Sequence, residues 1–184
     1  MKEFMRMMAN GNKLHVYTGG GKGKTTAAMG LALRAAGHGQ RVLVAQFMKK
    51  ANSGELKAFG VFDNVRVMTA PPIRGFTFRM TEEEKRLTRD EQTAFARELC
   101  GTISVFRPQT VILDELGMAL VTGMVDEDTA KALVDTALQS GETAITGHDI
   151  PEWLGERADY LSRITAEKHP YASEKLAARK GVEW

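Results

Sequence analysis

The residues with the clearest chemical potential are a glycine- and lysine-rich run near the N-terminus, TGGGKGKTT over residues 18–26. Glycines let backbone N–H groups turn inward and cradle phosphate oxygens, and the start of a following helix adds the positive end of its dipole. A lysine supplies a cation, and the hydroxyl of the next threonine can bind Mg²⁺. The run predicts a triphosphate seat made by Gly19, Gly20, Gly21, Lys22, Gly23, Lys24, Thr25 and Thr26.

The structural alternative to this prediction is a glycine-rich turn that binds nothing. A strand, a loop and a helix in that order favour the phosphate seat over the bare turn. The generic phosphate-loop motif begins with glycine, however, and the residue in that position is Thr18. The generic motif is therefore incomplete in this chain.

An acidic pair follows an apolar strand in the middle of the chain, where residues 110–115 read TVILDE. In phosphate-loop enzymes an acid at the end of such a strand helps to hold the magnesium ion. We expect one of Asp114 and Glu115 to reach the metal, directly or through water, and the other to position a ligand or to order the loop. The structural alternative is a helix cap after a buried strand.

Short β-rich runs alternate with longer helical patterns, which is typical of a mostly parallel sheet with helices on both faces. The predicted strands are residues 14–18, 41–47, 65–68, 110–113, 142–146 and 160–165. The predicted helices, whose apolar residues recur at three- and four-residue steps, are residues 25–36, 82–106, 126–139 and 151–158. We therefore expect an α/β protein with a single-domain, P-loop NTPase-like fold.

Local signals define the ends of the longest predicted helix. Thr81 and the three glutamates after it form a capping box with acids at the positive helix end, and Arg107-Pro108 stops the helix. Residues 49–60 and 69–79 have no regular pattern. Both stretches follow strands, and the loops at the carboxyl ends of parallel strands form the ligand site in such sheets.

Composition indicates an ordinary soluble globular protein. The chain has 184 residues, of which 43% are hydrophobic and 26% charged, and no apolar run is long enough to span a membrane. Residues 1–13 lack the apolar core of a secretory signal, so we expect a cytoplasmic protein. A net charge of +2 is too small to indicate nucleic acid, although the C-terminal end is locally basic. We predict a domain over residues 13–184 and an N-terminal arm over residues 1–12, which is either flexible or an apolar contact.

Several further motifs give the chain a family resemblance. They are the loop from Thr18, LALRAAGHG from residue 31, VAQFMK from residue 44, GE at 54–55, GFTF at 75–78, LDE at 113–115, TG at 146–147, KHP at 168–170 and GVE at 181–183. Over most of its length the chain resembles the P-loop type of ATP:corrinoid adenosyltransferases, which act on cob(I)alamin or cob(I)yrinic acid a,c-diamide. A threonine-led loop is this family's own form.

The resemblance implies that a cobalt(I) nucleophile attacks the 5′ carbon of ATP and expels triphosphate. It implies that Lys22, Lys24, Thr25 and Thr26 hold the triphosphate, and that Thr25 and Glu115 hold Mg²⁺. Arg34 would make a further polar contact to ATP. Lys24 and Glu115 would be the catalytic residues, because they act on charge that grows on the leaving group.

The resemblance also assigns a pair of aromatics to the corrinoid. Phe76 and Phe78 would flank the corrinoid and displace the lower ligand of its cobalt, while the structural alternative is that they close a small core under a loop. The chain departs from the family at Phe78, where tryptophan is common, and at His148, where arginine is usual. Histidine lacks the bidentate fork of arginine, so His148 is either a weaker phosphate contact or a helix cap.

The expected partners follow from the same resemblance. They are a corrinoid substrate, a second copy of the chain in a homodimer and a reduced flavodoxin-type electron donor; we expect neither nucleic acid nor a membrane. Two other functions stay open at the level of residues. One is a P-loop ATPase or kinase that uses Asp114 and Glu115 for magnesium and for the nucleophile. The other is a nucleotide-dependent binding module that acts through the basic C-terminal end.

Overall fold

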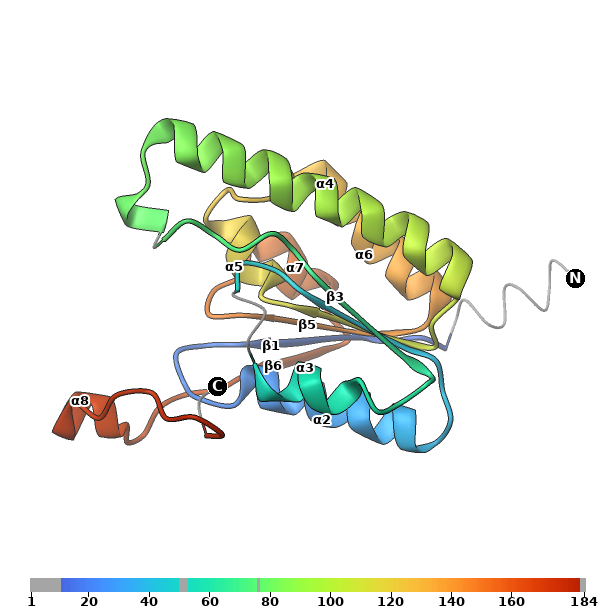
Figure 1. Ribbon diagram of the computed structural model, residues 1–184, viewed down its shortest axis with the longest axis horizontal. Helices are drawn as coiled ribbons and strands as arrows, with labels where there is room; N and C mark the ends of the chain where they lie inside the picture. Colours follow the sequence, from blue (N-terminus) through green and yellow to red (C-terminus); the bar gives the residue numbers. More distant parts are fainter. Residues whose placement is uncertain (1–10, 50–52, 76, 183–184) are drawn as a thin grey trace, which may run out of the picture.

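A six-stranded parallel sheet forms the centre of the protein in the computed structural model, which describes residues 11–49, 53–75 and 77–182 (Figure 1). The strand order is β3-β2-β4-β5-β1-β6, and every pairing is parallel. The strands are β1 (Leu14–Thr18), β2 (Val42–Gln46), β3 (Val65–Thr69), β4 (Thr110–Asp114), β5 (Glu142–Gly147) and β6 (Tyr160–Arg163). The predicted α/β fold with a parallel sheet is confirmed.

Helices cover both faces of the sheet (Figure 1). On one face lie α4 (Glu82–Phe106), α5 (Leu116–Val121), α6 (Glu127–Ser140) and α7 (Glu152–Arg157); on the other lie α2 (Lys24–Gly37) and α3 (Gly54–Phe59). Residues of β2 alternate between the two resulting cores. Leu43 and Ala45 pack in the core under α4, and Val42 and Val44 pack in the core under α2. This period of two is the geometry of a strand that is buried on both sides.

The ends of α4 form as their residues predict. The Thr81 hydroxyl accepts a hydrogen bond from the Glu84 N–H at 3.2 Å, and the Glu84 carboxylate accepts one from the Thr81 N–H at 2.8 Å. At the other end Arg107 adopts a left-handed conformation with φ 50°, and Pro108 follows. These contacts satisfy backbone groups that a helix end leaves without partners.

Three short helices were not expected from the sequence. They are α3, α5 and α8 (Pro170–Glu174), and each spans six residues or fewer. A segment of this length carries only a weak helical period, and of the described short helices only α7, predicted over residues 151–158, was found from it. The KHPY segment at residues 168–171 leads into α8, where the His169 ring accepts from the Tyr171 N–H at 3.2 Å. In the irregular stretch 69–79 the structure adds a single 3₁₀ turn, η1 (Thr77–Arg79).

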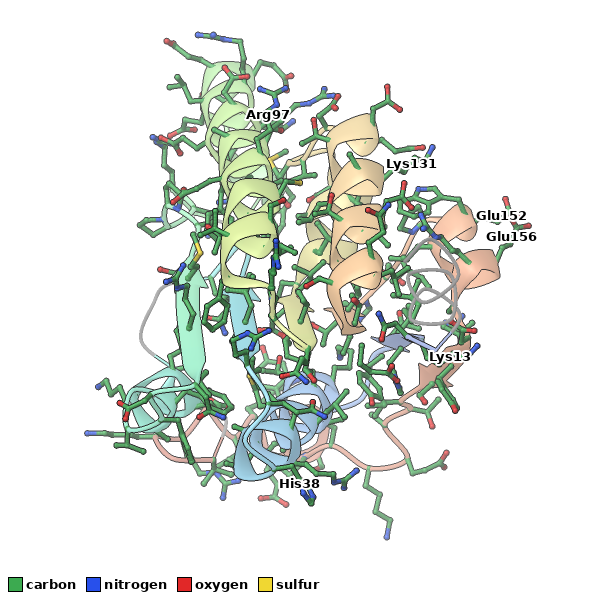
Figure 2. All side chains as sticks on the ribbon, turned by 90° about the vertical axis from the view of Figure 1, so that its right-hand side faces the viewer. Lys13, His38, Arg97, Lys131, Glu152 and Glu156 are labelled. Atoms are coloured by element: carbon green, nitrogen blue, oxygen red, sulfur yellow. The ribbon has the colours of Figure 1, made fainter. Side chains whose placement is uncertain are left out.

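The edges of the sheet have different roles. Charged side chains point outward from the outer helices and from the edge where the strands begin, as Arg97, Lys131 and Lys13 show in Figure 2. The carboxyl ends of the strands lie at the opposite edge, beyond which both η1 and α8 extend (Figure 1). None of the described helices is both long and apolar enough to cross a membrane. The predicted N-terminal arm falls mostly on residues 1–10, which lie outside the described residues.

Candidate functional site

The glycine-rich loop joins β1 to α2 and packs closely against two neighbouring segments. Its Gly19 N–H donates to the His148 carbonyl at 3.0 Å, and its Gly21 N–H donates to the Ile164 carbonyl at 2.8 Å. Gly19 has a φ of 105°, and a Cβ added there would collide with the Ile164 carbonyl oxygen. Glycine is therefore required at Gly19 both for its backbone conformation and for space.

Lys24, the first residue of α2, turns its side chain back over this loop. The ammonium donates to the carbonyl oxygens of Gly19 at 2.7 Å and of Gly21 at 2.8 Å. A positive charge thus lies inside the loop, at the N-terminal end of a 14-residue helix. A helix N-terminus and a lysine together favour a bound anion such as a phosphate chain.

Asp114 is the centre of a buried polar cluster at the end of β4. Its side chain has no exposed surface. One carboxylate oxygen accepts from the hydroxyls of Thr25 at 2.9 Å and Thr146 at 2.7 Å. The other accepts from the Gln46 amide at 3.0 Å and the Lys49 ammonium at 2.7 Å. Four donors, from the start of α2, from β5 and from the end of β2 with the turn after it, hold Asp114 in one position, as a buried carboxylate requires.

Glu115 follows directly and adopts a left-handed conformation with φ 63°. Its N–H donates to the Thr146 hydroxyl at 2.9 Å, and one carboxylate oxygen lies 3.7 Å from the Lys49 ammonium. Burial raises the pKa of the Glu115 carboxyl above its ordinary value, while the charge of Lys49 acts in the opposite direction. Glu115 stands at the N-cap position of α5, but its side chain makes no capping hydrogen bond. The helix-cap alternative therefore does not explain this side chain.

The donor set of this cluster fits a magnesium ion. It offers the Thr25 hydroxyl and the carboxylates of Asp114 and Glu115, which are the hard oxygen ligands that Mg²⁺ prefers. In addition, the buried Oε1 of Gln46 has no hydrogen-bond partner among the described residues and suits a water ligand of a hydrated cation. The described residues contain no group of three His, Cys, Asp or Glu that could hold a metal alone, so further ligands must come from water or substrate phosphate.

A cavity of about 510 Å³ lies beside the loop. Lys22 contributes to its wall, and most of the remaining wall comes from the C-terminal segment, including His169, Tyr171 and Arg179. His148 is also close to the loop, because its carbonyl accepts from Gly19 and its ring Nδ1 lies 2.8 Å from an Asp149 carboxylate oxygen. The KHPY segment from residue 168, to which the sequence assigned no role, thus forms part of the surroundings of the loop.

Other predicted residues lie farther from this centre. Arg34 is in the last turn of α2, about 15 Å from Lys24 along the helix axis at the usual rise per residue. It lines a separate cavity of about 490 Å³ with His38 and Gln40, so its contact with ATP stays a prediction. Thr26 faces a smaller cavity of about 280 Å³.

The predicted aromatic pair is described only in part. Phe78 lies in η1 with 77% of its surface exposed, and the Arg79 guanidinium lies over its ring at 5.4 Å. This exposure excludes the alternative that Phe78 closes a small core. Phe76 lies outside the described residues.

Three residues of the cluster had no predicted role: Gln46, Lys49 and Thr146. All of them stand at or just after the carboxyl end of a strand, and the motifs from residues 44 and 146 contain them. The register that sets Gln46 beside Asp114 belongs to the sheet and cannot be read from either strand alone. Their polar types at the ends of apolar strands were the available signal.

A parallel sheet, a glycine-rich loop that leads from β1 into a helix, and an acidic pair at the end of β4 are the features of a protein with a P-loop NTPase-like fold. Comparison with known proteins gives the family within that class. Residues 10–184 match the family described as ATP:corrinoid adenosyltransferase BtuR/CobO/CobP. The chain belongs to this ATP:corrinoid adenosyltransferase family.

Three similar proteins, each named a corrinoid adenosyltransferase, agree with this assignment. The protein from Pseudomonas aeruginosa is 31% identical over 93% of this chain and 83% of its own length. The protein from Escherichia coli strain K12 is 34% identical over 92% of this chain and 84% of its own length. The Salmonella typhimurium protein, named corrinoid adenosyltransferase CobA, is 30% identical over 92% of this chain and 84% of its own length.

Family membership decides between the functions that the residues left open. The family is one of enzymes that adenosylate corrinoids and use ATP as the co-substrate. The chain is therefore a corrinoid-adenosylating enzyme, and the ATPase, kinase and binding-module alternatives are not favoured.

Proposed function

We propose that the protein transfers the 5′-deoxyadenosyl group of ATP to the cobalt(I) of a corrinoid and releases triphosphate. The observation that carries the proposal is the meeting of Lys24, Thr25 and the Asp114–Glu115 pair at one edge of the sheet, in a chain of this family. The same edge holds the exposed Phe78 on one side and the cavity beside Lys22 on the other.

The reaction balances as a nucleophilic substitution at carbon. The cobalt(I) electron pair forms the cobalt–carbon bond, so that cobalt becomes formally cobalt(III). The bond between the 5′ carbon and its oxygen breaks, and its electrons leave with the triphosphate. Negative charge therefore grows on the α-phosphate side, where fixed positive groups stabilise the transition state most.

The chain supplies those groups in the proposed roles. Lys24, with Lys22 and the backbone of Gly19, Gly20, Gly21 and Gly23, would bind and orient the triphosphate. Thr25 and Glu115 would hold Mg²⁺, and Asp114 would keep the Thr25 hydroxyl in place through its hydrogen bond of 2.9 Å. When bound, the metal would supply positive charge to the leaving group. Thr26 and Arg34 are retained as further polar contacts to ATP.

The proposed corrinoid contact is the segment that carries Phe76 and Phe78. Phe78 is available, because it is exposed on η1 beyond the carboxyl edge of the sheet. An apolar ring against the lower face of the corrinoid would oppose the return of the lower cobalt ligand and ease reduction to cobalt(I). We propose that ATP and Mg²⁺ bind first and that a reduced flavodoxin-type protein supplies the electron. A cytoplasmic homodimer is part of the same proposal.

The decisive test is anaerobic incubation of the protein with ATP, Mg²⁺ and chemically reduced cob(I)alamin. The expected result is an absorbance spectrum of a light-sensitive alkylcobalamin, with intact triphosphate in equal amount. Formation of ADP and phosphate without an organometallic product would contradict the proposal. Omission of Mg²⁺ should slow the transfer strongly, since the leaving group then loses its main counter-charge.

A further inference from the structure

Lys49 places a positive charge among the oxygen atoms of the cluster whose donor set fits magnesium, namely those of Thr25, Asp114 and Glu115. Its ammonium donates to the Thr25 hydroxyl at 3.0 Å and to the Asp114 carboxylate at 2.7 Å, and it lies 3.7 Å from a Glu115 carboxylate oxygen. A divalent cation needs the same oxygens at shorter distances. The ammonium and a metal ion therefore cannot both contact this set.

The backbone before Lys49 is held firmly in an uncommon conformation. Met48 has a φ of 58°, which is left-handed for a residue with a side chain. Its N–H donates to the side-chain oxygen of the buried Gln92 at 3.2 Å, and the Gln92 amide donates to the Pro71 carbonyl at 2.9 Å. A helix on one face of the sheet thus fixes the turn from which Lys49 extends. Such conformations persist where the surroundings determine them, often at functional sites.

The charge of Lys49 also matters to Asp114. A carboxylate with no exposed surface is costly unless a cation or several donors compensate it. Lys24 does not supply this charge, because its ammonium donates to loop carbonyls instead. Among the described residues, the cation paired with Asp114 is Lys49.

We propose that Lys49 is a positioning residue that serves as an internal counter-ion for the metal site. It holds Thr25, Asp114 and Glu115 together, keeps free divalent cations out, and moves to the polyphosphate when metal and nucleotide arrive together. The inference rests on the proposed function, since it assumes that these oxygens bind the metal. Its consequence is that metal and triphosphate bind cooperatively, and by linkage each favours the other equally.

The first test measures free Mn²⁺ binding by electron paramagnetic resonance, without nucleotide or corrinoid. Lys49→Met should bind Mn²⁺ about tenfold or more tightly than the unaltered protein, because like charges a few ångströms apart repel strongly even near a protein surface. Lys49→Arg keeps the charge and should bind as weakly as the unaltered protein. Lys57→Met, which removes an exposed lysine of α3, controls for the change in net charge. Equal Mn²⁺ affinity in Lys49→Met and the unaltered protein would overturn the inference.

The second test uses the complex of Mn²⁺ with inorganic tripolyphosphate. Lys49→Met should bind this complex about tenfold more weakly, since a cation that contacts phosphate has been lost. The two effects have opposite signs, whereas a purely structural role would weaken both kinds of binding. Should Lys49→Met not fold, Lys49→Gln keeps a donor for Asp114 and carries the same expectations. The proposed role would be refuted if neither Lys49→Met nor Lys49→Gln binds free Mn²⁺ more tightly and the Mn²⁺–tripolyphosphate complex more weakly.

These measurements separate the inference from the proposed function. Neither test contains a corrinoid, so a protein that fails to alkylate cobalamin can still show the exchange of Lys49. Conversely, normal alkylation combined with unchanged Mn²⁺ affinity in Lys49→Met would leave the proposed function in place and remove the inference about Lys49 alone.

Discussion

Asp114 has no exposed surface and accepts four hydrogen bonds, whereas Phe78 has 77% of its surface exposed and its ring is covered on one face by Arg79. Both belong to the same proposed site. The nucleotide end is buried and interlocked by side chains from β1–α2, β2, β4 and β5, while the corrinoid end stands on a single 3₁₀ turn. Within the proposed function, the difference favours a preorganised seat for triphosphate and metal and a corrinoid contact that forms later. This contrast favours an order in which the nucleotide binds first and the corrinoid second.

The strongest test of the preorganised half is Lys24→Ala. We expect the rate of adenosyl transfer to fall by at least about 100-fold, since a charged group aimed at the leaving group is lost. The fold should persist, because among the described residues the Lys24 ammonium donates hydrogen bonds only to loop carbonyls. Transfer rates and circular dichroism check both points, with Lys57→Ala as a matched lysine control. Retained activity in Lys24→Ala would contradict the assigned role.

Phe78→Ala tests the exposed half. The reduction of cobalt should be impaired by about tenfold or more while ATP binding is unchanged, because the ring is proposed to exclude water and the lower ligand from cobalt. Stability should change by less than about 0.5 kcal/mol, as for most exposed positions. Spectroscopic titration of cobalt(II) corrinoid and calorimetry with ATP measure the two effects. Phe78→Trp, which introduces the residue that the family resemblance leads us to expect there, should retain reduction. Equal losses of reduction and ATP binding in Phe78→Ala would indicate a packing role.

Glu115→Gln tests the buried half of the site through the dependence of stability on pH. Burial raises the folded-state pKa of Glu115, so the ionised carboxylate costs stability above that pKa, and the cost vanishes as pH falls toward the unfolded-state value of about 4.3. Measured with a chelator, Glu115→Gln should therefore be more stable than the unaltered protein at pH 7, and the gain should shrink at acidic pH. Transfer activity should be lost. A destabilised variant at pH 7 would show that the contact with Lys49 outweighs burial.

Glu84→Gln is a control in which the expected change in stability at pH 7 has the opposite sign. Hydrogen bonds from Thr81 lower the pKa of the Glu84 carboxyl, so its stabilisation is present above the unfolded-state pKa and is lost as pH falls through the folded-state pKa. This variant should be less stable at pH 7, and the difference should shrink in acid. Its transfer activity should be normal, because the capping box lies at the start of α4 and away from the metal cluster.

The smallest expected effect is that of Thr81→Ala. Loss of the N-cap should reduce the free energy of unfolding by about 1 kcal/mol, since one orphan N–H of α4 loses its acceptor. Urea unfolding measures this change, and the transfer rate should stay the same. A large loss of activity would show that the start of α4 helps to place η1, and the two halves of the site would then be less independent than their contacts indicate.

Much of the fold could be predicted because each long element has its own local signal. The alternation of strands and helices, the capping box at Thr81 and the stop at Pro108 all depend on neighbouring residues. The loop of residues 18–26 was equally accessible, since glycines, lysines and threonines at fixed spacing carry its chemistry. Among the short helices, α7 was predicted and α3, α5 and α8 were missed, because five or six residues give only a weak period.

By itself the sequence determined the α/β class, the glycine- and lysine-rich loop between a strand and a helix, and the acidic pair after a strand, since these arise from residues that are adjacent in the chain. Only the tertiary structure decided which distant side chains meet: Gln46, Lys49 and Thr146 converge on Asp114. The physical reason is that strand order and register place the ends of β2, β4 and β5 side by side. No local pattern encodes that arrangement, because it results from packing the whole sheet between its helices.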